Sequence, residues 1–76
     1  MPDPDIVVDA RGHRCPVPTL RLRRSLEAAP PGACVQLLAD DPLARIDVPH
    51  FAAGAGMELL AQEEVDGALS FLVRKP

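Results

Sequence analysis

Two prolines placed two positions apart, in the segment Cys15-Pro16-Val17-Pro18, restrict the local fold of this chain more than any other feature. Proline is tolerated in the first turn of a helix, where backbone N–H groups have no intrahelical partner. The segment therefore predicts a helix that begins at Pro16 with Cys15 as its N-cap. A thiol at that position lies at the positive end of the helix dipole, which predicts a lowered pKa. Because Pro16 and Pro18 carry no N–H, the free donors near the sulfur are expected on Val17 and Thr19.

Basic residues gather around this cysteine although the protein is acidic overall. Five of the eight lysines and arginines lie between residues 11 and 24, a stretch without acidic residues, while the whole chain has a formal net charge of −3. Nearby cations lower a thiol pKa and attract anionic partners. The pattern favours a reactive cysteine with electrostatic support from Arg11, His13 and Arg14. The alternatives are an ordinary half-buried cysteine and, for His13, an ordinary surface histidine.

The periodicity of the apolar residues predicts alternating strands and helices. Asp66-Gly67 is a strong signal for a two-residue hairpin turn, and Pro49 is expected to separate a short turn over residues 42–46 from the helix that follows it. The expected strands span residues 5–10, 34–39, 57–65 and 68–74, and the expected helices span 16–29 and 48–55. The order β-α-β-α-β-β predicts an α+β two-layer sandwich, in which a four-stranded mixed sheet carries both helices on one face.

The first helix has two apolar faces. At 100° per residue, Leu22 and Leu26 share the face that is expected to contact the sheet. The opposite face, near the cysteine, carries a second group: Val17, Leu20, Arg21 and Arg24. This second group is either a docking surface for partner proteins or a surface that neighbouring loops cover.

Cys34 lies on the sheet face opposite to Val35, because side chains alternate along a strand. That face is expected to be nearer to solvent and to carry Cys34, Gln36, Gln62 and Ser70. A structural role for Cys34 is favoured over a role as resolving partner of Cys15. Two cysteines are too few for a disulfide scaffold and have no metal-binding spacing, so neither a metal nor a cofactor is expected.

The length of 76 residues predicts one domain over residues 1–76, with residues 1–4 disordered. No apolar run approaches the ~20 residues of a membrane span, so no membrane association is expected. The acidic start of the chain lacks the basic and apolar regions of a signal peptide. A cytoplasmic protein with reduced thiols is therefore predicted.

The motifs of this chain, taken in order, resemble those of the small sulfur carriers of the TusA/SirA type. Residues 9–18, Asp-Ala-Arg-Gly-His-Arg-Cys-Pro-Val-Pro, are similar to the family signature Asp-x-x-Gly-x-x-Cys-Pro-x-Pro. Three later landmarks follow at matching spacing: Pro31-Gly32, Ala39-Asp40-Asp41-Pro42 and Asp47-Val48-Pro49-x-Phe51. The resemblance covers nearly the whole chain and implies the same β-α-β-α-β-β sandwich.

The resemblance also implies a function. The cysteine of the motif, here Cys15, would accept sulfane sulfur as a persulfide and pass it to the next protein, as a carrier rather than a stand-alone multi-step enzyme. A cysteine desulfurase or a rhodanese would be the donor, and a protein of the DsrE/TusD type the acceptor. The implied outlets are 2-thiouridine in tRNA, oxidation of sulfur compounds and molybdenum cofactor assembly. From their positions in the sequence, Asp41 and Asp47 are interpreted as helix caps rather than as acid/base groups.

Two other functions fit parts of the sequence. The arginine cluster suits the phosphates of RNA, but the net negative charge and the lack of exposed aromatic residues oppose this, so direct nucleic-acid binding is not expected. A regulatory interaction protein, in which Cys15-Pro16-Val17-Pro18 merely begins a helix, is the other alternative.

Overall fold

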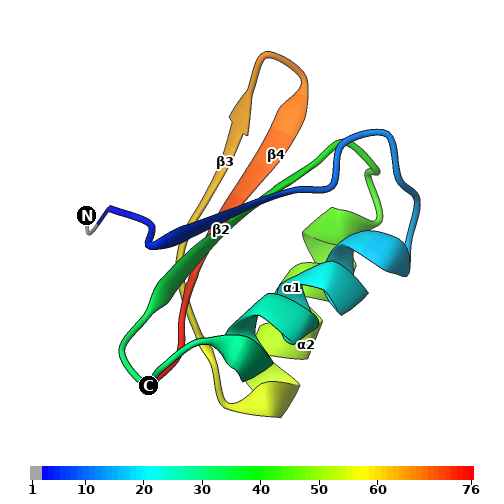
Figure 1. The fold of residues 1–76 in the computed structure, drawn as a ribbon. Coiled ribbons are helices and arrows are strands. Elements are labelled where there is room, and N and C mark those ends of the chain that lie inside the picture. Colours follow the sequence, from blue (N-terminus) through cyan, green and yellow to red (C-terminus); the bar gives the residue numbers. More distant parts are fainter. Residues whose placement is uncertain (1–2) are drawn as a thin grey trace.

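The computed structural model describes residues 3–76, which contain four strands and two helices in the predicted order (Figure 1). The strands are β1 (Ile6–Asp9), β2 (Cys34–Ala39), β3 (Glu58–Val65) and β4 (Ala68–Arg74), and the helices are α1 (Val17–Ala28) and α2 (Ala44–Ala55). The disorder expected for residues 1–4 falls partly on residues 1–2, which lie outside the described residues. Asp3 and Pro4 have no regular secondary structure.

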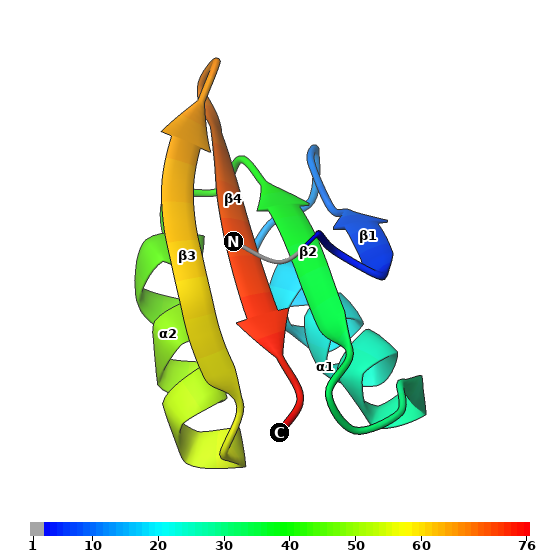
Figure 2. The same cartoon turned by 90° about the vertical axis from the view of Figure 1, so that its left-hand side faces the viewer.

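The sheet has the strand order β1-β2-β4-β3. β1 is parallel to β2, whereas β4 is antiparallel to both of its neighbours, so the predicted mixed sheet is confirmed. In Figure 2 the sheet faces the viewer and both helices lie behind it, which confirms a two-layer sandwich with the helices on one face. The predicted hairpin turn joins β3 to β4, with φ values of 51° at Asp66 and 80° at Gly67. Neither helix of residues 3–76 has the length and apolar character needed to cross a bilayer.

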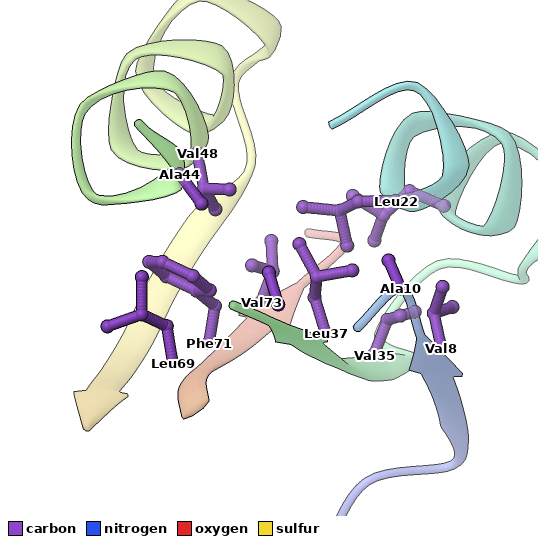
Figure 3. Packing of buried hydrophobic residues seen from close by; sticks show 12 residues of the cluster. Val8, Ala10, Leu22, Val35, Leu37, Ala44, Val48, Leu69, Phe71 and Val73 are labelled. Carbon is purple, nitrogen blue, oxygen red and sulfur yellow. The ribbon is translucent and has the colours of Figure 1, made fainter. Parts of the chain in front are cut away.

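The core lies between the sheet and the two helices (Figure 3). Leu22 and Leu26 of α1 are fully buried, as their spacing of four residues predicts. They meet the alternating residues of the central strands, and Phe71 of β4 fills the space beneath Val48 of α2. Apolar burial on this one face holds both helices against the sheet.

α2 differs from the prediction because it continues through Pro49. Proline removes one donor, which leaves the carbonyl of Arg45, four residues earlier, without its helical partner. Arg45 is exposed, so water can satisfy that carbonyl. Ala44, Val48 and Ala52 are spaced four residues apart and are all buried, and this packing holds the turn and the helix together as one element.

Two residues of the open sheet face also differ from the prediction. Cys34 is on that face but is only 4% exposed, because Arg74 stands directly opposite on β4 and Asp5 hydrogen-bonds its backbone N–H at 2.9 Å. Gln62 pairs in register with Phe71, whose side chain points to the helices, so Gln62 lies on the helix side of the edge strand. A register shift between Leu59 and Ala61 reverses the alternation that predicted the opposite face.

Candidate functional site

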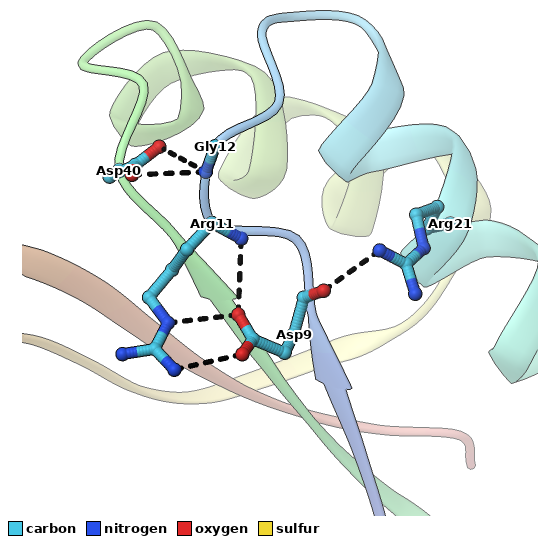
Figure 4. A network of polar contacts seen from close by, with 5 residues as sticks. All are labelled: Asp9, Arg11, Gly12, Arg21 and Asp40. Atoms are coloured by element: carbon cyan, nitrogen blue, oxygen red, sulfur yellow. Dashed lines mark hydrogen bonds and ion pairs between the residues drawn. The ribbon is translucent and has the colours of Figure 1, made fainter.

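The loop between β1 and α1 holds Cys15, and two consecutive aspartates from the end of β2 anchor it. The backbone N–H of Gly12 donates to both carboxylate oxygens of Asp40 at 3.0 Å (Figure 4). Gly12 has φ 85°, a left-handed conformation that favours glycine. The backbone N–H of Cys15 donates to Oδ2 of Asp41 at 2.6 Å, and Oδ1 of Asp41 accepts the N–H of Leu43 at 3.1 Å. These contacts fix the cysteine backbone from a segment far along the chain.

Cys15 is not the N-cap of α1, contrary to the prediction. The helix begins at Val17, and Pro16 occupies the cap position. The N–H of Val17 donates to the carbonyl of Arg14 at 2.9 Å, so this donor is not free for the sulfur. Pro16 and Pro18 still lie at the start of the helix, but the helix begins one residue later than the local pattern indicates.

The half-buried Cys15 thiol is in direct contact with a carboxylate. Its Sγ–H donates to the carboxylate of Asp47, which lies in the first turn of α2 and is not the helix cap that the sequence indicates. This hydrogen bond, together with partial burial and the negative charges of Asp47 and Asp41, raises the pKa of the Cys15 thiol above its ordinary value. The lowered pKa expected from the helix dipole and the arginines is therefore wrong.

Two of the arginines brace the end of β1 instead. The guanidinium of Arg11 binds both carboxylate oxygens of Asp9 at 2.8 and 2.9 Å, and Arg21 donates to the carbonyl of Asp9 at 2.8 Å (Figure 4). The hydrogen bonds from Arg11 lower the pKa of Asp9 to about 2. Arg11 is thus paired with a carboxylate, whereas His13 and Arg14 remain beside the cysteine.

An open groove of about 470 Å³ lies next to Cys15, between residues 12–15 on one side and residues 40–43 on the other. Leu43 forms an apolar rim and is 54% exposed. Leu43 was not singled out in the sequence analysis. The signal that could have found it is an apolar residue directly after the Asp-Asp-Pro landmark. The groove leaves room for a segment of another molecule to approach the sulfur.

The outer face of α1 is exposed, as one of the two sequence interpretations requires. Val17 is 38% exposed and Leu20 is 53% exposed, so neighbouring loops do not cover them. A shallow groove lined by Leu20, Arg23, Arg24, Glu27 and Ala28 follows this side of the helix.

Fold and site together define a class: a small two-layer α+β sandwich that presents a cysteine just before its first helix, in a loop held by hydrogen bonds to the segment that follows β2. The family model described as sulfurtransferase TusA matches residues 6–75, and the chain therefore belongs to this family. Membership assigns it the role of a sulfur carrier or sulfurtransferase and gives no support to the RNA-binding or regulatory alternatives.

Individual relatives agree with this assignment. A sulfur carrier protein TusA from Pseudomonas putida is 38% identical over 72 residues, which cover 95% of this chain and 90% of the relative. The corresponding protein from Pseudomonas paraeruginosa is 35% identical over 71 residues, with 93% and 90% coverage. The crystal structure of a SirA-like protein from Desulfitobacterium hafniense superimposes with a TM-score of 0.81 at 30% identity and covers 91% of this chain and 95% of that one.

Proposed function

We propose that Cys15 is the residue on which this sulfur carrier accepts sulfane sulfur as a persulfide before passing it to an acceptor protein. The observation that carries the proposal is the difference between the two cysteines. Cys15 is half-buried beside an open groove, whereas Cys34 is 4% exposed beneath its neighbours. A partner protein must bring its own sulfur into contact with the carrier thiol, and the groove offers that approach only to Cys15.

The anchored loop supports this chemistry. Persulfide transfer is an attack of a thiolate on the outer sulfur of a persulfide. The rate therefore depends on access to the sulfur atoms and on the fraction of the attacking thiol that has lost its proton. The hydrogen bonds from Gly12 and Cys15 to Asp40 and Asp41 hold the loop in one position. Transfer then needs no deep pocket and no bound cofactor.

A sulfur carrier interacts with a protein that supplies sulfur and a protein that receives it. We expect a cysteine desulfurase or a rhodanese as donor and a DsrE/TusD-type protein as acceptor, in the cytoplasm. Both are expected to dock beside the sulfur, on Val17, Leu20, Arg21 and Arg24 of α1 and on Leu43 across the groove. Because only a few apolar residues contribute, this surface suits short-lived complexes, and its arginines favour acidic partner surfaces.

Intact mass spectrometry tests the assignment of Cys15. The protein is incubated with a cysteine desulfurase and cysteine, and each bound sulfur adds about 32 Da as a persulfide. Cys34→Ser is the matched control and is expected to gain sulfur as the wild type does, whereas Cys15→Ser gains none and keeps its fold. Sulfur on Cys34, or on neither cysteine, would contradict the proposal.

A further inference from the structure

The contact between Cys15 and Asp47 is not needed to present a thiol to a partner. Asp47 lies 32 positions further along the chain, and its carboxylate accepts the Sγ–H of Cys15. A carrier that must react as a thiolate gains nothing in thiolate population from a carboxylate at its sulfur, because the negative charge favours the protonated thiol. The arrangement therefore calls for a role in which the proton itself is used.

The surroundings of the sulfur restrict where that proton can go. Asp47 and Ala44 of α2, Pro18 and Thr19 of α1 and Asp41 border a recess beside Cys15 that is too narrow to admit a water molecule. On the outer side, His13, Arg14, Asp40 and Asp41 line the open groove. Of the two carboxylates that border this recess, Asp47 is the one that accepts the hydrogen bond from the thiol.

The neighbouring Asp41 has a different task. Both of its oxygens accept backbone N–H groups, from Cys15 at 2.6 Å and from Leu43 at 3.1 Å, and these bonds lower its pKa. A carboxylate that is bound in this way positions the loop and stays ionised. The carboxylate of Asp47, in contrast, accepts its hydrogen bond from the sulfur of Cys15.

We propose that Asp47 takes the thiol proton of Cys15 when sulfur is loaded and returns a proton when sulfur is unloaded, a role that rests on the proposed function of Cys15. In loading, Asp47 accepts the proton and the Cys15 thiolate attacks the outer sulfur of the donor persulfide. The donor S–S bond breaks as the new S–S bond forms on Cys15. The electron pair of the broken bond leaves on the donor thiolate, which takes the proton from Asp47.

Unloading follows the same steps in reverse. Asp47 accepts the proton of the acceptor thiol, whose thiolate attacks the outer sulfur of the Cys15 persulfide. Cys15 leaves as a thiolate and recovers the proton from Asp47. A thiol and a persulfide enter each step and a persulfide and a thiol leave it, so no oxidant or reductant is consumed. From unloading until the next loading, the same hydrogen bond keeps the thiol of the empty carrier protonated.

The substitution Asp47→Asn tests this role, because asparagine has the same shape but cannot take a proton. Asp66→Asn, in the turn between β3 and β4, is the matched control. All variants carry Cys34→Ser, so that iodoacetamide reports on Cys15 alone. The pH at which alkylation is half-maximal is expected to fall in Asp47→Asn and to stay unchanged in Asp66→Asn, because loss of the carboxylate removes the main cause of the raised thiol pKa.

The rate of persulfide transfer is expected to fall in Asp47→Asn, whereas the rate of alkylation at neutral pH rises. Loss of general acid–base assistance slows such steps by about 10²-fold or more, although Asp47→Asn has more thiolate at neutral pH. Faster alkylation combined with slower transfer separates proton transfer from a merely structural effect, which would not move the alkylation profile. If Asp47→Asn does not fold, Asp47→Ser gives the same two measurements with a smaller side chain.

Three outcomes would overturn the proposal, and the third is distinguishable from the first two. Transfer to Asp47→Asn at the wild-type rate, or an unchanged alkylation profile, refutes the role of Asp47 and leaves Cys15 as the carrier residue. A wild-type protein that gains no sulfur from the donor refutes the carrier function of Cys15 and the transfer role of Asp47 together.

Discussion

At the level of single residues, hydrogen bonds to a few carboxylates set the charge states around the cysteine loop. Arg11 holds Asp9 ionised, whereas Asp47 holds the Cys15 thiol protonated. The two effects have opposite consequences for stability. The stabilisation from Asp9 is present above its unfolded pKa of 3.8 and is lost as pH falls towards about 2. The stabilisation from the protonated Cys15 is present at neutral pH and is lost as pH rises through its raised pKa.

Asp9→Asn tests the loss of stability that is expected at acid pH. The wild type is expected to lose thermal stability as pH falls from about 4 to about 2, because protonation of Asp9 ends its contact with Arg11. Asp9→Asn has no carboxylate to protonate, so its melting temperature is expected to fall less steeply in that window. Thermal melts across the acid range measure the difference. Equal slopes for the two proteins would show that the pair of Asp9 and Arg11 does not couple to folding.

At the level of elements, α1 separates two functions on its two faces. Leu22 is fully buried against the sheet, whereas Leu20, two positions earlier, is 53% exposed. Arg21 belongs partly to the structural side, because it donates to the carbonyl of Asp9. Reversal of its charge therefore disturbs the end of β1 as well as any docking surface, and Arg24→Glu is the cleaner test of electrostatic docking.

Leu20 and Leu22 form a matched pair for separating docking from folding. Leu20→Asp is expected to slow persulfide transfer several-fold and to leave the melting temperature nearly unchanged, because surface substitutions usually alter stability by less than about 0.5 kcal/mol. Leu22→Ala is expected to lower the free energy of unfolding by about 2–5 kcal/mol, because it leaves a cavity in the core. Transfer rates and urea unfolding curves measure the two effects. Unaltered transfer in Leu20→Asp would exclude this face from docking.

At the level of the whole molecule, residues from distant segments complete structures that no single element forms alone. The last turn of α1 illustrates this, because its free carbonyl groups need donors. Nζ of Lys75, from the segment after β4, donates to the carbonyl of Glu27 in this turn at 3.5 Å and to the carbonyl of Ala29, the C-cap residue, at 2.9 Å. A basic side chain at a helix carboxyl end also interacts favourably with the helix dipole.

Lys75→Met tests the contribution of this cap. Methionine keeps a long apolar stem but removes the charge and the donors, so the free energy of unfolding is expected to fall by about 0.3–1 kcal/mol. Urea unfolding measures the change, and Arg23→Met on the exposed side of α1 is the comparison, since it loses only a surface pair with Glu27. An effect of Lys75→Met no larger than that of Arg23→Met would show that the cap is unimportant.

The amino-acid sequence by itself determined the order of the elements, the hairpin turn and the buried face of α1. These features follow from local rules: proline and glycine end elements, alternation defines strands, and a spacing of four residues defines the face of a helix. The same rules led to the correct bounds of β2 and β4. They failed at Gln62, where a register shift in the sheet reversed the alternation.

Only the tertiary structure decided the proton state of Cys15. Local sequence places arginines near the sulfur, but Arg11 and Arg21 turn to Asp9, while Asp41 and Asp47 come to Cys15 from 26 and 32 positions away. Charge near a thiol depends on distance in space, and packing of both helices on one face of the sheet brings the start of α2 to the start of α1. The continuity of α2 through Pro49 has the same origin, because burial of Val48 outweighs one lost hydrogen bond.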